Sequence, residues 1–221
     1  MRKFATLISW VFLPLFTPIY ALLIALFLPV YANSYRSAES LFYMPFIAKM
    51  LFIILFFAFI VIAPGISFAM LKMNKTISSF SMENREERNT PILITGLYCF
   101  ILFFFLQFQS KQIWIPAILN SMVLGGALAA LVAAVINRRM KISLHAIGMG
   151  AFFGFFYMYS TQLEEIPYLI LIISILLGGI VLSARLALNS HDLKEIGWGY
   201  LLGFASQILT IYFYPLIINR I

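Results

Sequence analysis

Several uninterrupted apolar stretches run through the chain, and each is long enough to cross a lipid bilayer as a helix. About 20 apolar residues, at ~1.5 Å per residue, span the roughly 30 Å of hydrocarbon in a membrane. Of the 221 residues, 63% are hydrophobic and only 10% are charged, which is too little polar surface for a soluble domain of this length. The sequence therefore predicts an all-α fold, a polytopic transmembrane helix bundle.

We predict seven spans in a single integral-membrane domain that covers residues 1–221. They are expected at about 8–31, 46–71, 91–108, 113–136, 143–160, 166–184 and 196–217. Short connections make neighbouring spans antiparallel and leave no room for a soluble domain. The first segment begins like a signal peptide, but its apolar run is too long and is interrupted by prolines, so we expect a spanning helix instead.

Prolines and glycines inside the predicted spans indicate bends and close helix contacts. Pro18 and Pro64 are expected to kink their helices. The pairs Gly150-x-x-x-Gly154 and Gly199-x-x-x-Gly203 are typical of places where two membrane helices approach closely.

The net charge of +7 includes 15 basic residues, which divide unequally between the two sides of the predicted bundle. Eleven lie on the side shared with the N-terminus: Arg2, Lys3, Lys72, Lys75, Arg85, Arg88, Arg138, Arg139, Lys141, Arg185 and Lys194. Four lie on the other side: Arg36, Lys49, Lys111 and Arg220. The positive-inside rule predicts that the N-terminal side faces the cytoplasm. Nucleic-acid binding is not expected, because there is no soluble basic domain, and the lone Cys99 in an apolar run indicates packing rather than a disulfide or metal site.

Arg185, His191 and Glu195 lie where the last two apolar runs meet. Glu195 follows His191 by four residues, so on a helix its carboxylate reaches the imidazole ring. A carboxylate on one ring nitrogen fixes the tautomer and leaves the other nitrogen free for nucleophilic attack. Asp192 is an alternative carboxylate for this role.

Two further polar clusters are expected on the same membrane face, because two spans separate each cluster from the next. In the loop 84–91, Arg85 and Arg88 are three residues apart and can form a phosphate clamp, or the loop is simply solvated and its glutamates neutralise them. At the start of the fifth predicted span, Ser143 is expected to cap the helix and His145 lies on its first turn. The N-terminus of a helix favours an anion.

The cluster of Arg185, His191 and Glu195 resembles the third motif of the type 2 phosphatidic acid phosphatase superfamily. The shared pattern is Arg185, five residues, His191, three residues and Glu195, where the family usually has Asp at the last position. The resemblance covers roughly Ser81 to the C-terminus and points to a divergent bacterial branch of that family.

The other two motifs of the family are only partly present. The segment 142–146 is similar to the second motif, Pro-Ser-Gly-His, but keeps only Ser143 and His145. The first motif is normally Lys, six residues, Arg-Pro, and here it survives as Arg88 with Pro91 nearby. Ser81 stands where the lysine is expected, and Arg85 is the available substitute.

The resemblance implies a lipid-phosphate or diphosphate phosphatase of the bacterial inner membrane, with a six-helix phosphatase-like core. It implies that His191 is the nucleophile that becomes a phosphohistidine, that Glu195 orients it and that His145 protonates the leaving alcohol. The phosphate oxygens are then held by Arg85, Arg88, Ser143 and Arg185. No metal or other cofactor is implied, and the expected partners are the bilayer and a membrane lipid phosphate.

The incomplete motifs leave a second hypothesis open: a catalytically degenerate relative that binds a lipid phosphate or serves as a structural subunit of a membrane complex. A transporter is a third alternative, but transporters usually place ionisable residues near the bilayer midplane. Lys49 is the only charge well inside a predicted span, and we expect it to snorkel. The sequence does not choose among phosphatidate, phosphatidylglycerophosphate, polyprenyl diphosphate and lipid A as substrates.

Overall fold

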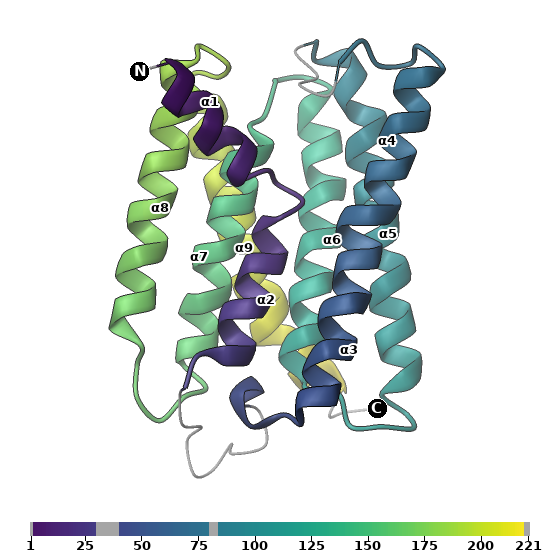
Figure 1. Cartoon of the computed structure of the whole chain (residues 1–221), viewed down its shortest axis with the longest axis vertical. Helices are drawn as coiled ribbons and strands as arrows, with labels where there is room; N and C mark the ends of the chain where they lie inside the picture. Colours follow the sequence, from purple (N-terminus) through teal and green to yellow (C-terminus); the bar gives the residue numbers. More distant parts are fainter. Residues whose placement is uncertain (1, 30–39, 80–83, 219–221) are drawn as a thin grey trace.

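The computed structural model describes residues 2–29, 40–79 and 84–218, and all regular elements within these ranges are helical. The α-helices are α1 (Arg2–Val11), α2 (Thr17–Phe27), α3 (Phe46–Phe56), α4 (Ala63–Met73), α5 (Asn89–Gln109), α6 (Ala117–Asn137), α7 (Leu144–Ser160), α8 (Tyr168–Ala187) and α9 (Leu193–Ile218). Three shorter elements join them: the 3₁₀ turns η2 (Leu41–Tyr43) and η4 (Glu86–Arg88), and the π-helical segment η3 (Phe57–Ile62). The long helices run side by side along one axis, whereas α1 is tilted across one end of the bundle (Figure 1).

Five helices in the described ranges are long and apolar enough to cross a membrane: Phe46–Met73, Glu86–Gln109, Ala117–Asn137, Tyr168–Ala187 and Leu193–Ile217. The all-α membrane bundle is therefore supported, but the count of seven spans is not confirmed. The fifth predicted span corresponds to α7, whose 17 residues reach about 25 Å as a helix.

The first predicted span, 8–31, is broken into two short helices in its described part. Helix α1 ends at Val11, and α2 begins at Thr17 after a turn in which the Thr17 hydroxyl donates to the Pro14 carbonyl at 3.0 Å. Pro14 has no N–H to continue α1, and its ring would clash with the preceding turn of a helix. Pro18 instead lies in the first turn of α2, where proline is tolerated, so it starts a helix rather than kinking one.

The second predicted span is one long helix with a change of hydrogen-bond register in the middle. In η3 the bonds are wider than in an α-helix, and the N–H of Ala63 donates to the carbonyl of Ala58, five residues earlier. Pro64 follows immediately, in the first turn of α4, and supplies no N–H to the ladder. The sequence predicts a kink at Pro64, and the structure has a π-helical segment directly before it, a feature that is common near functional sites.

Glycines bring α7 and α9 into close contact, as their spacing predicts. A Cβ added to Gly203 would lie 2.0 Å from the carbonyl oxygen of Ile147, and one added to Gly150 would lie 2.0 Å from that of Tyr200. Only glycine permits such an approach of two backbones. The contact also joins the two helix starts, because the N–H of Ser143 donates to the carbonyl of Glu195 at 3.3 Å.

The connections α4–α5, α6–α7 and α8–α9 lie at the same end of the bundle as the N-terminus (Figure 1). This arrangement agrees with the prediction that the three polar clusters share one face. Of the four basic residues expected at the other end, Arg36 and Arg220 lie outside the described residues. Lys49 differs from the snorkelling prediction: it is buried, donates to the Phe42 carbonyl at 2.7 Å and faces the rings of Phe27 and Phe42.

Candidate functional site

The corner between α8 and α9 is held by a cap at each helix end. Asn189 has a positive φ of 53°, and the N–H of Ser190 donates to the carbonyl of Arg185 at 3.2 Å. This left-handed residue with its bond back over the last turn ends α8 as a Schellman motif. Asp192 then caps α9, because its side chain accepts the N–H of Glu195 at 2.7 Å. The sequence from Arg185 to Glu195 therefore dictates the corner that holds His191.

His191 is fixed by Glu195, as the four-residue spacing predicts. Its Nδ1 lies 2.6 Å from Oε2 of Glu195, and both side chains are largely buried. An ionised carboxylate only accepts hydrogen bonds, so this contact assigns the hydrogen to Nδ1 and leaves a lone pair on Nε2. Asp192, the alternative carboxylate, is used for the helix cap instead.

The surroundings of His191 keep its ring neutral. Burial lowers the pKa of His191 to about 2, and the charges of Arg88, Arg185 and Lys141 and the neighbouring His145 act in the same direction. An imidazole in this state is unprotonated near pH 7, which a nucleophilic nitrogen requires.

His145 projects from the first turn of α7 and contacts α1. Its Nε2 lies 3.0 Å from the carbonyl oxygen of Ser9. Because a carbonyl only accepts, Nε2 of His145 carries a hydrogen, and this nitrogen can act as a general acid once Nδ1 is protonated as well. The hydroxyl of the same Ser9 accepts a hydrogen bond from Nη1 of Arg185 at 3.3 Å, whereas the buried Nε of Arg185 has no hydrogen-bond partner among the described residues.

Two more cations lie beside these groups. Arg88 is 4% exposed and donates to the carbonyl of Ile142 at 3.2 Å. Lys141 donates to the carbonyl of Ser190 at 3.0 Å, next to His191 in the sequence. Lys141 was not among the predicted site residues, although the predicted topology already placed it on the right face.

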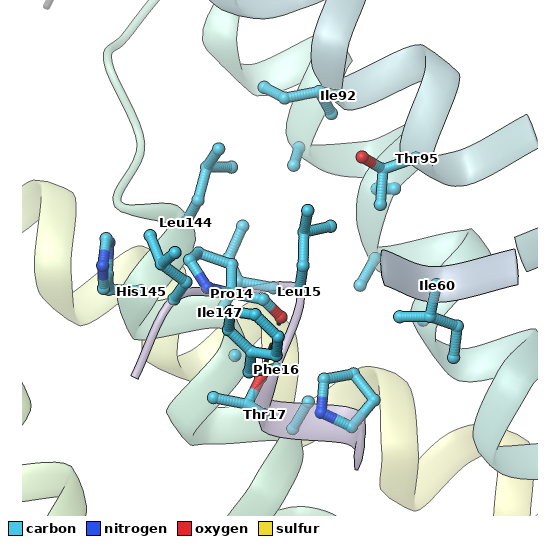
Figure 2. A pocket seen from close by; sticks show the side chains of 18 of the residues that line it. Pro14, Leu15, Phe16, Thr17, Ile60, Ile92, Thr95, Leu144, His145 and Ile147 are labelled. Carbon is cyan, nitrogen blue, oxygen red and sulfur yellow. Dashed lines mark hydrogen bonds between the residues drawn. The ribbon is translucent and has the colours of Figure 1, made fainter. Parts of the chain in front are cut away.

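These groups line one cavity of about 1020 Å³, and the described residues in its wall include no Asp or Glu. The polar residues at the charged end of the wall include Ser9, Arg88, Lys141, His145, Arg185, Ser190 and His191. The connection between α1 and α2 also forms part of the wall, and in Figure 2 Pro14–Thr17 lies between His145 on one side and Ile60 and Thr95 on the other. The site is therefore an electropositive cavity in which two histidines and three cations converge.

The structure does not bring every predicted residue to this cavity. Arg85 is exposed and donates to the Arg139 carbonyl at 2.9 Å, so it does not share a clamp with Arg88. Ser143 is the predicted helix cap, with its hydroxyl accepting the N–H of Ala146 at 3.4 Å, but it is fully buried and off the cavity wall. Ser81 lies outside the described residues.

Comparisons with known proteins place no constraint on this site: no family model, curated protein or solved structure matches the chain. The chemistry therefore rests on the geometry alone. A neutral imidazole held by a carboxylate, a second imidazole that carries a donor N–H, and three cations form a set suited to phosphoryl transfer, which depends on positioning and charge stabilisation.

Proposed function

We propose that this protein is a membrane phosphatase that hydrolyses a lipid phosphate or diphosphate through a phosphohistidine on His191. The observation that carries the proposal is the contact between His191 Nδ1 and Glu195 Oε2, which leaves Nε2 as a neutral nucleophile in a cavity lined by cations. The same motif supports the resemblance to the type 2 phosphatidic acid phosphatases.

In the first step, Nε2 of His191 attacks phosphorus, and the bond from phosphorus to the substrate alcohol breaks. His145 acts here as an imidazolium, with a hydrogen on each ring nitrogen, and gives the proton on its Nε2 to the leaving oxygen, so that an alcohol departs and a neutral ring remains. Arg88, Lys141 and Arg185 stabilise the negative charge on the transferring group. The unpartnered Nε of Arg185 is one donor that a phosphate oxygen can satisfy.

In the second step, water attacks the phosphohistidine and the nitrogen–phosphorus bond breaks. His145, now a neutral ring with a lone pair on Nε2, takes a proton from this water and returns to the imidazolium form. His191 leaves with its lone pair restored, and inorganic phosphate is the second product. The proposed reaction needs no redox partner, and its atoms and charges balance over the two steps.

A second candidate function is binding without turnover, and the contacts of Ser9 favour it. The Ser9 carbonyl accepts a hydrogen bond from the Nε2 hydrogen of His145 that catalysis needs, and the Ser9 hydroxyl accepts one from Nη1 of Arg185. A substrate must displace the Ser9 carbonyl from His145 before His145 can act on the leaving group. If this contact persists, the protein is a lipid-phosphate binder or a structural subunit of a membrane complex.

The experiment that separates the two candidates measures phosphate release and binding side by side. Purified full-length protein is given a panel of lipid phosphates and diphosphates, and binding is measured with alkyl phosphonates, whose carbon–phosphorus bond is not hydrolysed. We expect the native protein to release phosphate. His191→Ala should abolish this release while phosphonate binding persists. Neither a chelator nor Gln112→Ala, a change at the far end of the bundle, should affect the release. Binding without release from any member of the panel supports the second candidate.

A further inference from the structure

The candidate cavity extends well beyond the phosphate-binding groups into the helix bundle. Its wall on α6 runs from Ala133, near the charged end, to Met122. These 11 steps along a helix correspond to about 16 Å at ~1.5 Å per residue, roughly half the thickness of a bilayer hydrocarbon core. A free phosphate ion would leave most of this depth unused.

The deep part of the cavity is apolar and is kept open by small side chains. On α6 the wall contains Gly126, Ala129, Ala130 and Ala133, whose spacing puts them on one face of the helix. A Cβ added to Gly126 would meet only the sulfur of Cys99, at 3.9 Å, so the space in front of this glycine is not filled by neighbouring helices.

Larger apolar side chains close the inner end. They are Phe56, Met122, Val123 and Phe152. Gln207 also reaches the wall at this depth, where it is 3% exposed, donates to the Met122 carbonyl at 3.1 Å and keeps a buried Oε1 without a hydrogen-bond partner among the described residues. The charged end and the apolar end together fit a molecule with one anionic head and one apolar chain.

We propose that the cavity holds the apolar chain of the phosphate ester inside the helix bundle, and that the floor at Met122 and Val123 limits the chain length. This inference rests on the proposed function for the identity of the head group. The ligand class is a single-chain lipid phosphate whose phosphate lies among Arg88, Lys141 and Arg185. The chain lies along the small-residue face of α6, and its end lies near Val123.

The test measures kcat/KM for a series of single-chain alkyl phosphates of increasing length, and binding of the matching alkyl phosphonates. Gly126→Leu projects a side chain into the middle of the cavity, so we expect a loss of about tenfold or more for the longest chains and little change for the shortest. Gly179→Leu is the matched control, because a Cβ at this exposed glycine of α8 meets nothing within 4 Å and lies off the cavity wall. It should leave the chain-length profile unchanged.

Val123→Ala provides an independent test in the opposite direction, should Gly126→Leu fail to fold. It deepens the floor, and the preferred chain should become longer. An unchanged optimum in the folded variants, or an equal loss at every chain length, overturns the proposal. If the preferred chain length for phosphonate binding shifts but no phosphate is released, the chain site is supported and the proposed catalysis is refuted. If phosphate is released but the preferred chain length does not shift, the catalysis is supported and the chain site is refuted.

Discussion

Nδ1 of His191 lies 2.6 Å from Oε2 of Glu195, across a corner whose two helices are capped by Asn189 and Asp192. The caps hold the ring in place, and the carboxylate determines which ring nitrogen carries the hydrogen. Glu195 thus acts through His191 rather than on the substrate. It is a positioning residue in the proposed reaction.

The first prediction concerns this contact. Glu195→Gln removes the carboxylate charge that stabilises the Nδ1 hydrogen, so we expect kcat to fall by about 10²-fold or more. The dissociation constant for an alkyl phosphonate should change little, because the cations that bind the head group remain. Asp192→Asn is the matched control, since asparagine also caps helices well, and its kcat should stay near that of the native protein. Equal losses in the two variants would show that Glu195 matters only for the fold of the corner.

The second prediction concerns pH. Folding lowers the pKa of His191 to about 2, from an unfolded value near 6.5. Between these values the unfolded chain binds a proton that the folded chain does not, so this residue makes stability fall as the pH decreases below about 6.5. The thermal unfolding temperature in detergent should therefore fall on acidification. In His191→Asn the slope of this temperature against pH should be smaller. Identical slopes in the two proteins would contradict the buried, neutral state of His191.

The third prediction tests how the helices position the site. Gly203→Ala puts a Cβ where the Ile147 carbonyl lies, so α7 and α9 must separate and carry His145 away from His191. We expect a loss of about 1–3 kcal/mol in the free energy of unfolding, as is typical of overpacking, together with a loss of activity. Gly197→Ala is the control on the same helix, because a Cβ there meets nothing within 4 Å. If both variants behave like the native protein, the close contact is not needed to build the site.

Much of this arrangement could be predicted from the sequence because it depends on local rules. Apolar length predicts membrane helices, and the four-residue spacing of His191 and Glu195 predicts their contact on a helical turn. Counting spans placed the three clusters at one end, even though the N-terminal segment is broken in its described part. The clusters lie in the connections α4–α5, α6–α7 and α8–α9. Their shared end depends only on how the helices after the N-terminal segment alternate in direction, so the break in that segment does not change it.

The remaining features depend on contacts between distant segments. The spacing of Arg85 and Arg88 suggested one clamp, but each guanidinium binds a different carbonyl of the α6–α7 segment, and only Arg88 reaches the cavity. Ser9 meets His145 across 136 positions of sequence, and no local pattern indicates such a contact. In the sequence Lys141 belongs to a basic surplus that is explained by orientation or by contact with an anionic headgroup, and only the fold shows that it lies beside His191.

The fourth prediction concerns sidedness. The excess of basic residues at the site end predicts that this end faces the cytoplasm. On a Cys99→Ser background, Asn74→Cys marks the site end and Gln112→Cys the opposite end, and both positions are exposed. In intact cells, a membrane-impermeant thiol reagent should label Cys at position 112 and reach position 74 only after lysis. The reverse pattern would show that the site faces outward and that its positive charge serves the substrate.

The fifth prediction is the covalent intermediate, and its detection tests the central claim most directly. The protein is mixed rapidly with a lipid phosphate labelled on phosphorus, quenched in alkali, which preserves phosphohistidine, and digested for mass spectrometry. His145→Ala should increase the trapped amount when the substrate has a good leaving group, because His145 activates the water in the second step. We predict label on His191 and none in His191→Asn. Phosphate release at the native rate by His191→Asn, or turnover of the native protein without any label on His191, would contradict the proposed mechanism.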